Sequence, residues 1–204
     1  MGIEPAACDR ARRNVREQPG GRQFEPVDAG AEPTAAEDRS VNLDDGDRDS
    51  IATLIAVQEG RPPVPLLDDA GIRELLRSGP RFAIVGASAR PGRPVHGVMQ
   101  TLRRAGYDVV PVSPASDEVD GLRCYPTLAE AVRETGAVDI VNVFRRPDQC
   151  AEHAREAVAV GARCLWLQQG IANAEAGRIA HGSGLMVVMD RCTAVEHRRL
   201  AADG

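Results

Sequence analysis

A single stretch, from Phe82 to Gln100, limits most strongly what this chain can fold into. It opens with a short apolar run, Phe82–Val85, which is typical of a strand buried on both faces. Gly86 and other small residues follow at once, and an amphipathic helical pattern begins at Pro94. In a strand, glycine turn and helix of this kind, backbone N–H groups at the helix start can bind a phosphate. The stretch therefore predicts a nucleotide-like ligand that carries phosphates.

Residues suited to phosphate binding gather in and beside the predicted turn. Arg90 and Arg93 supply positive charge where a phosphate would lie. Ser88 can cap the turn or donate a hydrogen bond to the ligand. His96 falls in the first turn of the helix, within reach of the same ligand. The residues that we expect to contact the phosphates are Gly86, Ala87, Ser88, Arg90, Arg93 and His96.

Strand-like and helix-like segments alternate along the rest of the chain. Apolar runs of strand length occupy residues 82–85, 107–112, 139–144, 163–168 and 185–189. Helical patterns lie at residues 68–78, 94–105, 127–134, 147–160 and 193–200, with a further short helix after Asn173. This alternation predicts a single α/β domain, a Rossmann-like doubly wound parallel sheet.

In such sheets the ligand lies over the carboxyl ends of the strands. The second strand ends at Ser113 and Pro114, and we expect both residues at the site. The third strand ends at Phe144, Arg145 and Arg146, where the two arginines are predicted ligand contacts. Phe144 suits either the core or stacking on a base. Gln168, at the end of the fourth strand, suits either capping of the next helix or binding of a ligand amide.

Other reactive side chains do not form a catalytic or metal-binding pattern. The four histidines are scattered, and none lies near a Ser or Cys in a recognisable nucleophile setting. Five cysteines without a CxxC pair are expected to be reduced thiols. Near the C-terminus, Arg191 and Glu196 are expected to tie the last helix to the sheet. We therefore predict no catalytic residue and no metal site.

The first 65 residues differ in composition from the rest. They are rich in Pro, Gly, Ala and charged residues, and they hold the whole net charge of −5, because acidic and arginine side chains balance from residue 67 onward. Such a segment buries too little apolar surface to offset its ordering entropy. We expect a disordered acidic extension over residues 1–65, with one short helix or strand at residues 50–58, and the folded domain over residues 66–204.

Several functional classes fit the sequence poorly. The chain contains no lysine, which excludes a Schiff-base lysine and a P-loop lysine. The glycines at Gly86, Gly92 and Gly97 do not have dinucleotide spacing, and no acid follows the second strand, so NAD fits poorly, whereas the missing acid does not exclude NADP. The neutral domain lacks the basic face of a nucleic-acid binder. No apolar run reaches the roughly 18–20 residues of a membrane helix, and we expect a cytoplasmic protein that does not bind membranes.

Several stretches, taken together, resemble the small bacterial CoA-binding proteins, stand-alone relatives of the CoA-binding domain of the succinyl-CoA synthetase alpha subunit. They are IVGAS followed after five residues by Pro94, GYDVVPVSP, VDIVNVFRRP, GARCLWLQQG and VVMDRCTAVEH. The resemblance covers residues 66–200 and implies coenzyme A as the ligand. It implies a pyrophosphate over Gly86–Ser88 and beside Arg93, an adenosine end near Ser113 and Pro114, and a cleft lined by Phe144, Arg145 and Arg146.

The synthetase to which these proteins are related uses a phosphorylated histidine in a second domain and a partner subunit, and this chain has no residues for such a domain. We therefore expect non-catalytic binding of CoA or an acyl-CoA, with no protein partner identified. The alternatives are an NADP-linked oxidoreductase, one component of a multi-chain acyl-CoA synthetase, or an interaction protein that uses the acidic extension. Whether Cys124, Cys150, Cys164 or Cys192 forms a mixed disulfide with CoA depends on an exposed thiol near the cleft.

Overall fold

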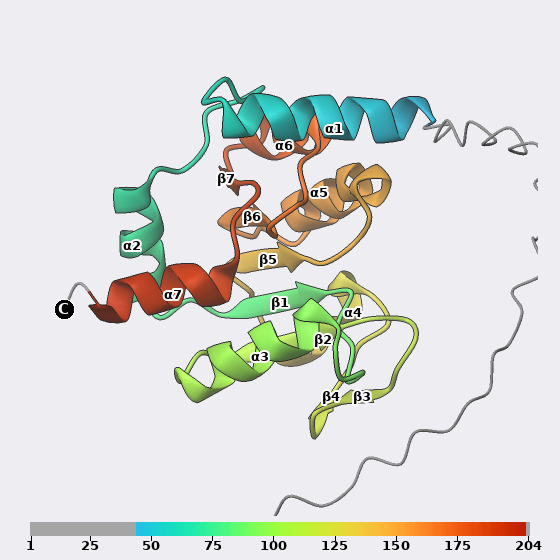
Figure 1. The fold of residues 1–204 in the computed structure, drawn as a ribbon. Coiled ribbons are helices and arrows are strands. Elements are labelled where there is room, and N and C mark those ends of the chain that lie inside the picture. The colour runs from blue at the N-terminus through green and yellow to red at the C-terminus, as the bar shows by residue number, and fades with distance from the viewer. Residues whose placement is uncertain (1–43, 203–204) are drawn as a thin grey trace, which may run out of the picture. The chain divides into compact units, whose positions relative to one another are not determined.

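The computed structural model describes residues 44–202, which form a parallel sheet with helices on both faces (Figure 1). The five strands pair in the order β2-β1-β5-β6-β7. They are β1 (Phe82–Val85), β2 (Val109–Val112), β5 (Ile140–Val143), β6 (Cys164–Leu167) and β7 (Met186–Val188). A short antiparallel pair, β3 (Glu118–Val119) and β4 (Leu122–Arg123), lies outside this sheet. The predicted Rossmann-like doubly wound sheet is confirmed.

Helices precede the first strand, connect the strands of the sheet and follow the last strand. They are α1 (Asp45–Gln58), α2 (Asp69–Arg77), α3 (Pro94–Arg104), α4 (Leu128–Thr135), the 3-10 helix η1 (Pro147–Gln149), α5 (Cys150–Ala159), α6 (Ala174–Gly182) and α7 (Thr193–Ala202). The sequence predicted one helix from Pro147, but the structure divides it into η1 and α5. Within residues 44–202, no helix is both long and apolar enough to cross a bilayer.

The strands are apolar at nearly every position because both faces of the sheet are covered. In β1, Ala83 and Val85 pack with the residues of α4, α5 and α6, whereas Phe82 and Ile84 pack with those of α2, α3 and α7. All four β1 residues are buried. Burial of one large apolar side chain contributes about 1.5–3 kcal/mol. These two cores hold the strand ends, and therefore the site, in place.

Short polar side chains mark the starts of four helices. The carboxylates of Asp44 and Asp68 accept backbone N–H groups at 2.7 and 2.8 Å. Thr127 Oγ1 accepts the N–H of Glu130 at 3.2 Å, and Asn173 Oδ1 accepts the N–H of Ala176 at 2.7 Å. The helix starts predicted at Asp68, at Thr127 and after Asn173 are thus confirmed, because capping depends on residues only a few positions apart.

The sheet order creates a switch point beside β1. From β1 the chain crosses to β2 on one side, and it then returns to β5 on the other side of β1. The connections after β1 and β5 therefore diverge above the carboxyl ends of these strands, which is where open α/β sheets bind ligands.

Residues 45–65 do not follow the prediction of a disordered extension. They contain α1, which lies alongside α6 (Figure 1), and α1 buries Ser50 and Thr53. Leu54 and Val57 pack against the core, and Val64 is itself a buried core residue. The short helix or strand predicted at residues 50–58 is thus a helix, which begins at Asp45 and is stabilised by tertiary packing rather than by a strong pattern of its own. The remainder of the predicted extension, residues 1–43, lies outside the described residues.

Candidate ligand-binding site

A cavity of about 480 Å³ lies at the carboxyl ends of β1, β5 and β6, at the switch point. Its volume is typical of a small-molecule site. Its wall comes from the end of β1, the first turns of α3, the segments that follow β5 and β6, and the residue before α7. The lining residues are Gly86, Arg93, Pro94, Val95, Val98, Phe144, Arg145, Arg146, Gln168, Gln169, Ile171 and Cys192.

The structure brings half of the predicted site residues to this cavity. Those that line it are Gly86, Arg93, Phe144, Arg145, Arg146 and Gln168. Those that do not are Ala87, Ser88, Arg90, His96, Ser113 and Pro114. The first group comes from the three adjacent central strands and from the start of α3. The strand-end rule therefore located the cavity itself but included residues of the neighbouring turns.

Three of the residues away from the cavity wall have structural partners. His96 Nε2 lies 3.0 Å from Asp120 Oδ1, which joins α3 to the turn between β3 and β4. Ser88 Oγ accepts the N–H of Arg90 at 3.2 Å. Ser113 Oγ accepts the N–H of Ala115 at 3.3 Å. His96 thus links two elements, whereas Ser88 and Ser113 stabilise the turns to which they belong.

Gly86 allows the ends of β1 and β5 to approach each other closely. Its φ is +85°, and a Cβ at this position would lie 2.7 Å from the carbonyl oxygen of Phe144. The N–H groups of Gly86 and Ala87 both donate to the carbonyl of Val112, at 2.9 and 3.2 Å. These two N–H groups are therefore paired with β2.

The start of α3 is the part of the cavity wall best suited to an anion. No side chain caps this helix, and its first turn holds no acidic residue. Each of the other six α-helices within residues 44–202 has at least one Asp or Glu in its first turn. A negative charge at a helix start is stabilised by about 0.3–1 kcal/mol, so the vacant place at α3 suits a ligand phosphate.

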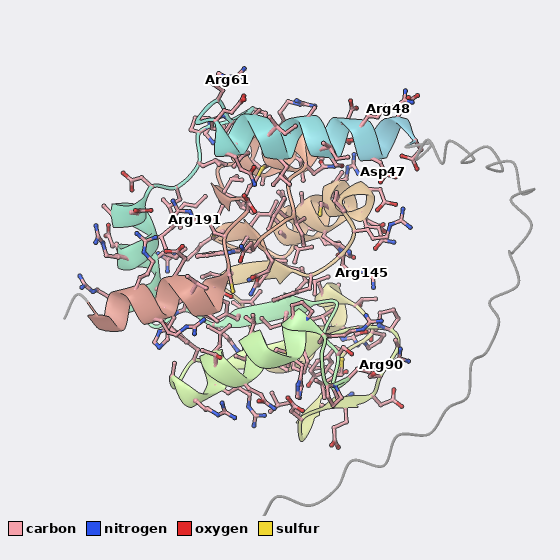
Figure 2. The ribbon with its side chains drawn as sticks, viewed as in Figure 1. Asp47, Arg48, Arg61, Arg90, Arg145 and Arg191 are labelled. Atoms are coloured by element: carbon pink, nitrogen blue, oxygen red, sulfur yellow. The ribbon has the colours of Figure 1, made fainter. Side chains whose placement is uncertain are left out.

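Positive charge surrounds the same cavity. Arg93, Arg145 and Arg146 line it, and no Asp or Glu does. Arg146 pairs with Asp148 at 3.2 Å in an exposed contact, whereas Arg93 and Arg145 have no carboxylate partner within the described part of the chain. Figure 2 shows Arg145 at the end of the sheet toward which β1 and β5 point, with Arg90 at the same end. The site thus offers unpaired guanidinium groups to a polyphosphate.

A buried polar cluster supports the inner wall. Gln168 Nε2 donates to Asn142 Oδ1 at 2.7 Å and to Thr193 Oγ1 at 2.8 Å. Asn142 Nδ2 donates to the same Thr193 oxygen at 3.2 Å. Both amide hydrogens of Gln168 are therefore used, and no hydrogen bond from residues 44–202 reaches its Oε1. Asn173, not Gln168, caps α6, so Gln168 is left with a carbonyl acceptor beside the cavity.

Asp190 holds the loop that carries Gln169 and Ile171. Its Oδ1 accepts the N–H of Gly170 at 2.7 Å, and its own N–H donates to the carbonyl of Ile171 at 3.2 Å. Its Oδ2 accepts Gln58 Nε2 at 3.0 Å, which links the end of α1 to this loop. Asp190 adopts a positive φ of 54°, which Asp tolerates better than most residues. The sequence analysis gave Asp190 no such role.

The apolar part of the wall was also missed as part of the site. Val95 and Val98, on the apolar side of α3, belong to the core and also line the cavity. Ile171 and Cys192 come from loops that carry no sequence signal of their own. Only the stripe of α3 could have indicated an apolar wall beside the phosphate-binding turn.

The side chains of Arg191 and Glu196 tie the last helix to α2, whereas the sequence predicted that they tie it to the sheet. Arg191 contacts Asp69 at 2.6 Å and Glu196 at 3.3 Å, which joins α7 to α2. The backbone carbonyl of Arg191 accepts Trp166 Nε1–H from β6 at 2.6 Å. Hydrogen bonds from Arg191 and then Arg199 hold the pKa of Asp69 below its usual range. The segment just before Cys192 is thereby fixed.

A cavity at the switch point, an uncapped helix start and unpaired arginines make this cavity the candidate site for a phosphate-bearing ligand. The sequence profile described as "CoA binding domain" matches residues 80–198, which is more than half of the chain. The chain therefore belongs to this family of CoA-binding domains, as the sequence resemblance implied. Membership of the family associates it with CoA.

Related proteins share this domain over nearly their full length. The chain is 41% identical over 128 residues to the uncharacterized protein YneT of Bacillus subtilis (strain 168), covering 63% of this chain and 93% of YneT. A solved structure of a hypothetical protein from Pyrococcus horikoshii OT3 is 38% identical, with a TM-score of 0.63, over 66% of this chain and 93% of that one. The structure of cell-free ID.343 from Thermus thermophilus is 36% identical, with a TM-score of 0.61, over 65% of this chain and 98% of that one.

Proposed function

We propose that this protein binds coenzyme A or an acyl-CoA in the cavity at the carboxyl ends of β1, β5 and β6, without catalysing a reaction on its own. The observation that carries the proposal is the charge of the wall. Three arginines line the cavity beside the uncapped start of α3, and no carboxylate does. In a chain of the CoA-binding family, this is the arrangement that a charged polyphosphate needs.

The wall suggests how the ligand lies. The pyrophosphate binds at the start of α3, beside Arg93 and Arg145, since these charges lack other partners. The adenosine end extends toward Ser113 and Pro114 at the end of β2. The pantetheine arm lies along Val95, Val98, Phe144 and Ile171, and one of its amide N–H groups donates to Gln168 Oε1. Charged groups of the wall thus face the phosphates of CoA, and apolar groups face its pantetheine arm.

The same wall supports a binding role rather than chemistry. None of its residues is a His, Asp or Glu, and Cys192 is the one lining residue of a type that can act as a general base. The buried amide of Gln168 and the arginines hold a ligand, but they do not accept protons at neutral pH. We propose the cytoplasm as the compartment, since the cysteines within residues 44–202 are free thiols.

Isothermal calorimetry tests the proposal, with CoA as ligand and with NADP and ATP as controls. We expect CoA to bind more tightly than either control, because only CoA fits both the charged and the apolar parts of the wall. The double variant Arg93→Ala/Arg145→Ala should weaken CoA binding at least tenfold. A matched variant, Arg77→Ala/Arg104→Ala, removes the same charge from exposed helix ends and should bind as wild type does. Absence of CoA binding by the folded protein would overturn the proposal.

A further inference from the structure

One thiol lies in the wall of the proposed CoA cavity. Among residues 44–202, Cys124, Cys150 and Cys164 are buried, and Cys192 is half-buried and lines the cavity. Burial raises the pKa of Cys150 to about 12 and also raises the pKa of Cys124 and Cys164. Buried thiols of this kind are inert, because the thiolate is the nucleophile. Within this part of the chain, Cys192 alone is placed to react with a bound ligand.

The backbone holds Cys192 firmly at the start of α7. Its carbonyl accepts the N–H groups of Val195 and Glu196 at 2.9 and 3.0 Å, so it occupies the cap position of that helix. The preceding residue, Arg191, is fixed by Trp166 and Asp69. The thiol is therefore carried by a rigid part of the fold rather than by a mobile loop.

A second feature of the same wall indicates where the ligand arm ends. Gln168 is 4% exposed, lines the cavity and has an acceptor oxygen without a hydrogen bond from residues 44–202. Because Gln168 lines the cavity, this oxygen can accept a hydrogen bond from a ligand N–H. Gln168 is bonded to Thr193, the residue next to Cys192, at 2.8 Å. The side chain of Gln168, whose carbonyl has no hydrogen bond from residues 44–202, is thus attached to Thr193. The thiol belongs to the preceding residue, Cys192.

The chemistry of CoA matches this pair. The thiol of CoA is separated from the last amide of its pantetheine arm by two methylene groups. With that amide N–H on Gln168 Oε1, the sulfur lies in the apolar part of the wall. Cys192 packs with the same apolar core as Val95 and Phe144. The arginines keep the phosphates in the charged part of the cavity, so the thiol end is the part of CoA that reaches Cys192.

We propose that Cys192 forms a reversible mixed disulfide with CoA held in this cavity, an inference that rests on the proposed CoA site. The co-reactant is an oxidised form of the ligand, a disulfide of CoA. The Cys192 thiolate attacks one sulfur of that disulfide, whose S–S bond breaks as the bond from Cys192 Sγ to the CoA sulfur forms. The second CoA leaves as a thiolate and takes up the proton that Cys192 lost. A free thiol reverses the exchange, so occupancy of the site follows the thiol redox state.

Intact-protein mass measurement after incubation with CoA disulfide tests this proposal. We expect one CoA adduct per chain, which dithiothreitol removes. The adduct should form at least tenfold faster than the adduct with glutathione disulfide, and desulfo-CoA, which lacks the thiol, should slow its formation. Cys192→Ser and Cys192→Ala should form no CoA adduct. Cys8→Ser and Cys124→Ser should form it as wild type does, because they leave Cys192 in place.

Calorimetry with reduced CoA separates this proposal from the proposed function. Wild type should bind reduced CoA, and both Cys192 variants should keep the wild-type circular dichroism spectrum, which shows that they are folded. Reduced CoA binding without any adduct in wild type, or an adduct that persists in both Cys192 variants, overturns the disulfide and leaves the CoA site standing. Absence of CoA binding in folded wild type overturns both.

Discussion

Replacement of Gly86 by alanine tests the closest backbone approach at the site. Gly86 has a φ of +85°, and an added Cβ would lie 2.7 Å from the carbonyl oxygen of Phe144 and 2.9 Å from Cδ of Arg145. A non-glycine residue in a left-handed conformation costs about 1–2 kcal/mol. Overpacking adds about 1–3 kcal/mol, because the obstructing oxygen belongs to the backbone and cannot rotate away. We expect Gly86→Ala to lower the free energy of unfolding by about 2–5 kcal/mol.

Gly106→Ala is the matched control. Gly106 has nearly the same φ, +87°, but an added Cβ would meet no atom within 4 Å. This variant should show only the conformational cost, about 1–2 kcal/mol. The difference between the two variants then measures the clash with Phe144. Urea unfolding followed by circular dichroism gives both values on the same scale.

CoA affinity gives a second comparison of Gly86→Ala with Gly106→Ala. In Gly86→Ala the segment of Phe144 and Arg145 must move away from β1, so CoA affinity should fall about tenfold, equivalent to about 1.4 kcal/mol. Gly106 lies outside the cavity wall, so its variant should bind CoA as wild type does. Equal destabilisation by the two substitutions, together with unchanged affinity in Gly86→Ala, would refute the close approach as the reason for glycine at this position.

Three further predictions concern charge and loop support. Arg145→Ala/Arg146→Ala should weaken CoA binding tenfold or more by calorimetry, about 1.4 kcal/mol, and unchanged affinity in the folded variant would contradict the placement of the phosphates. Asp190→Ala should speed amide hydrogen exchange at Gly170 and weaken CoA binding, because Asp190 anchors that loop, and unchanged exchange would contradict this role. The pKa of Asp69 is lowered on folding, so its contribution to stability is present above pH 3.8 and is lost as the pH falls through the folded pKa. The difference in melting temperature between wild type and Asp69→Asn should therefore be small but measurable at pH 7, since the pair is half-exposed, and should vanish at the lowest pH.

The elements of the fold could be predicted because local patterns specify them. The five strands are short apolar runs, and their helices start at capping residues such as Asp68, Thr127 and Asn173. Such signals depend on neighbours within a few positions, so one sequence is enough to recognise them. The alternation of the elements then allowed few topologies, and the strand-end rule located the cavity above the central strands.

The details of the site could not be predicted, because they depend on contacts between distant parts of the chain. Composition favoured disorder where α1 folds, since only packing against η1 and α6 makes that helix stable. The sequence predicted phosphate contacts at Gly86 and Ala87, but it could not show that their N–H groups pair with the carbonyl of Val112 in β2. Gln58 reaches Asp190 across 132 positions.

By itself, the sequence determined the class of fold, the edge of the sheet at which the cavity lies and the kinship with CoA-binding domains. Only the tertiary structure decided which side chains form the cavity wall, because that depends on how the sheet order brings separate loops together. Gln168 and Cys192 illustrate the distinction. Each is an ordinary residue in its own segment. Both line the cavity because β6 and α7 meet around Thr193.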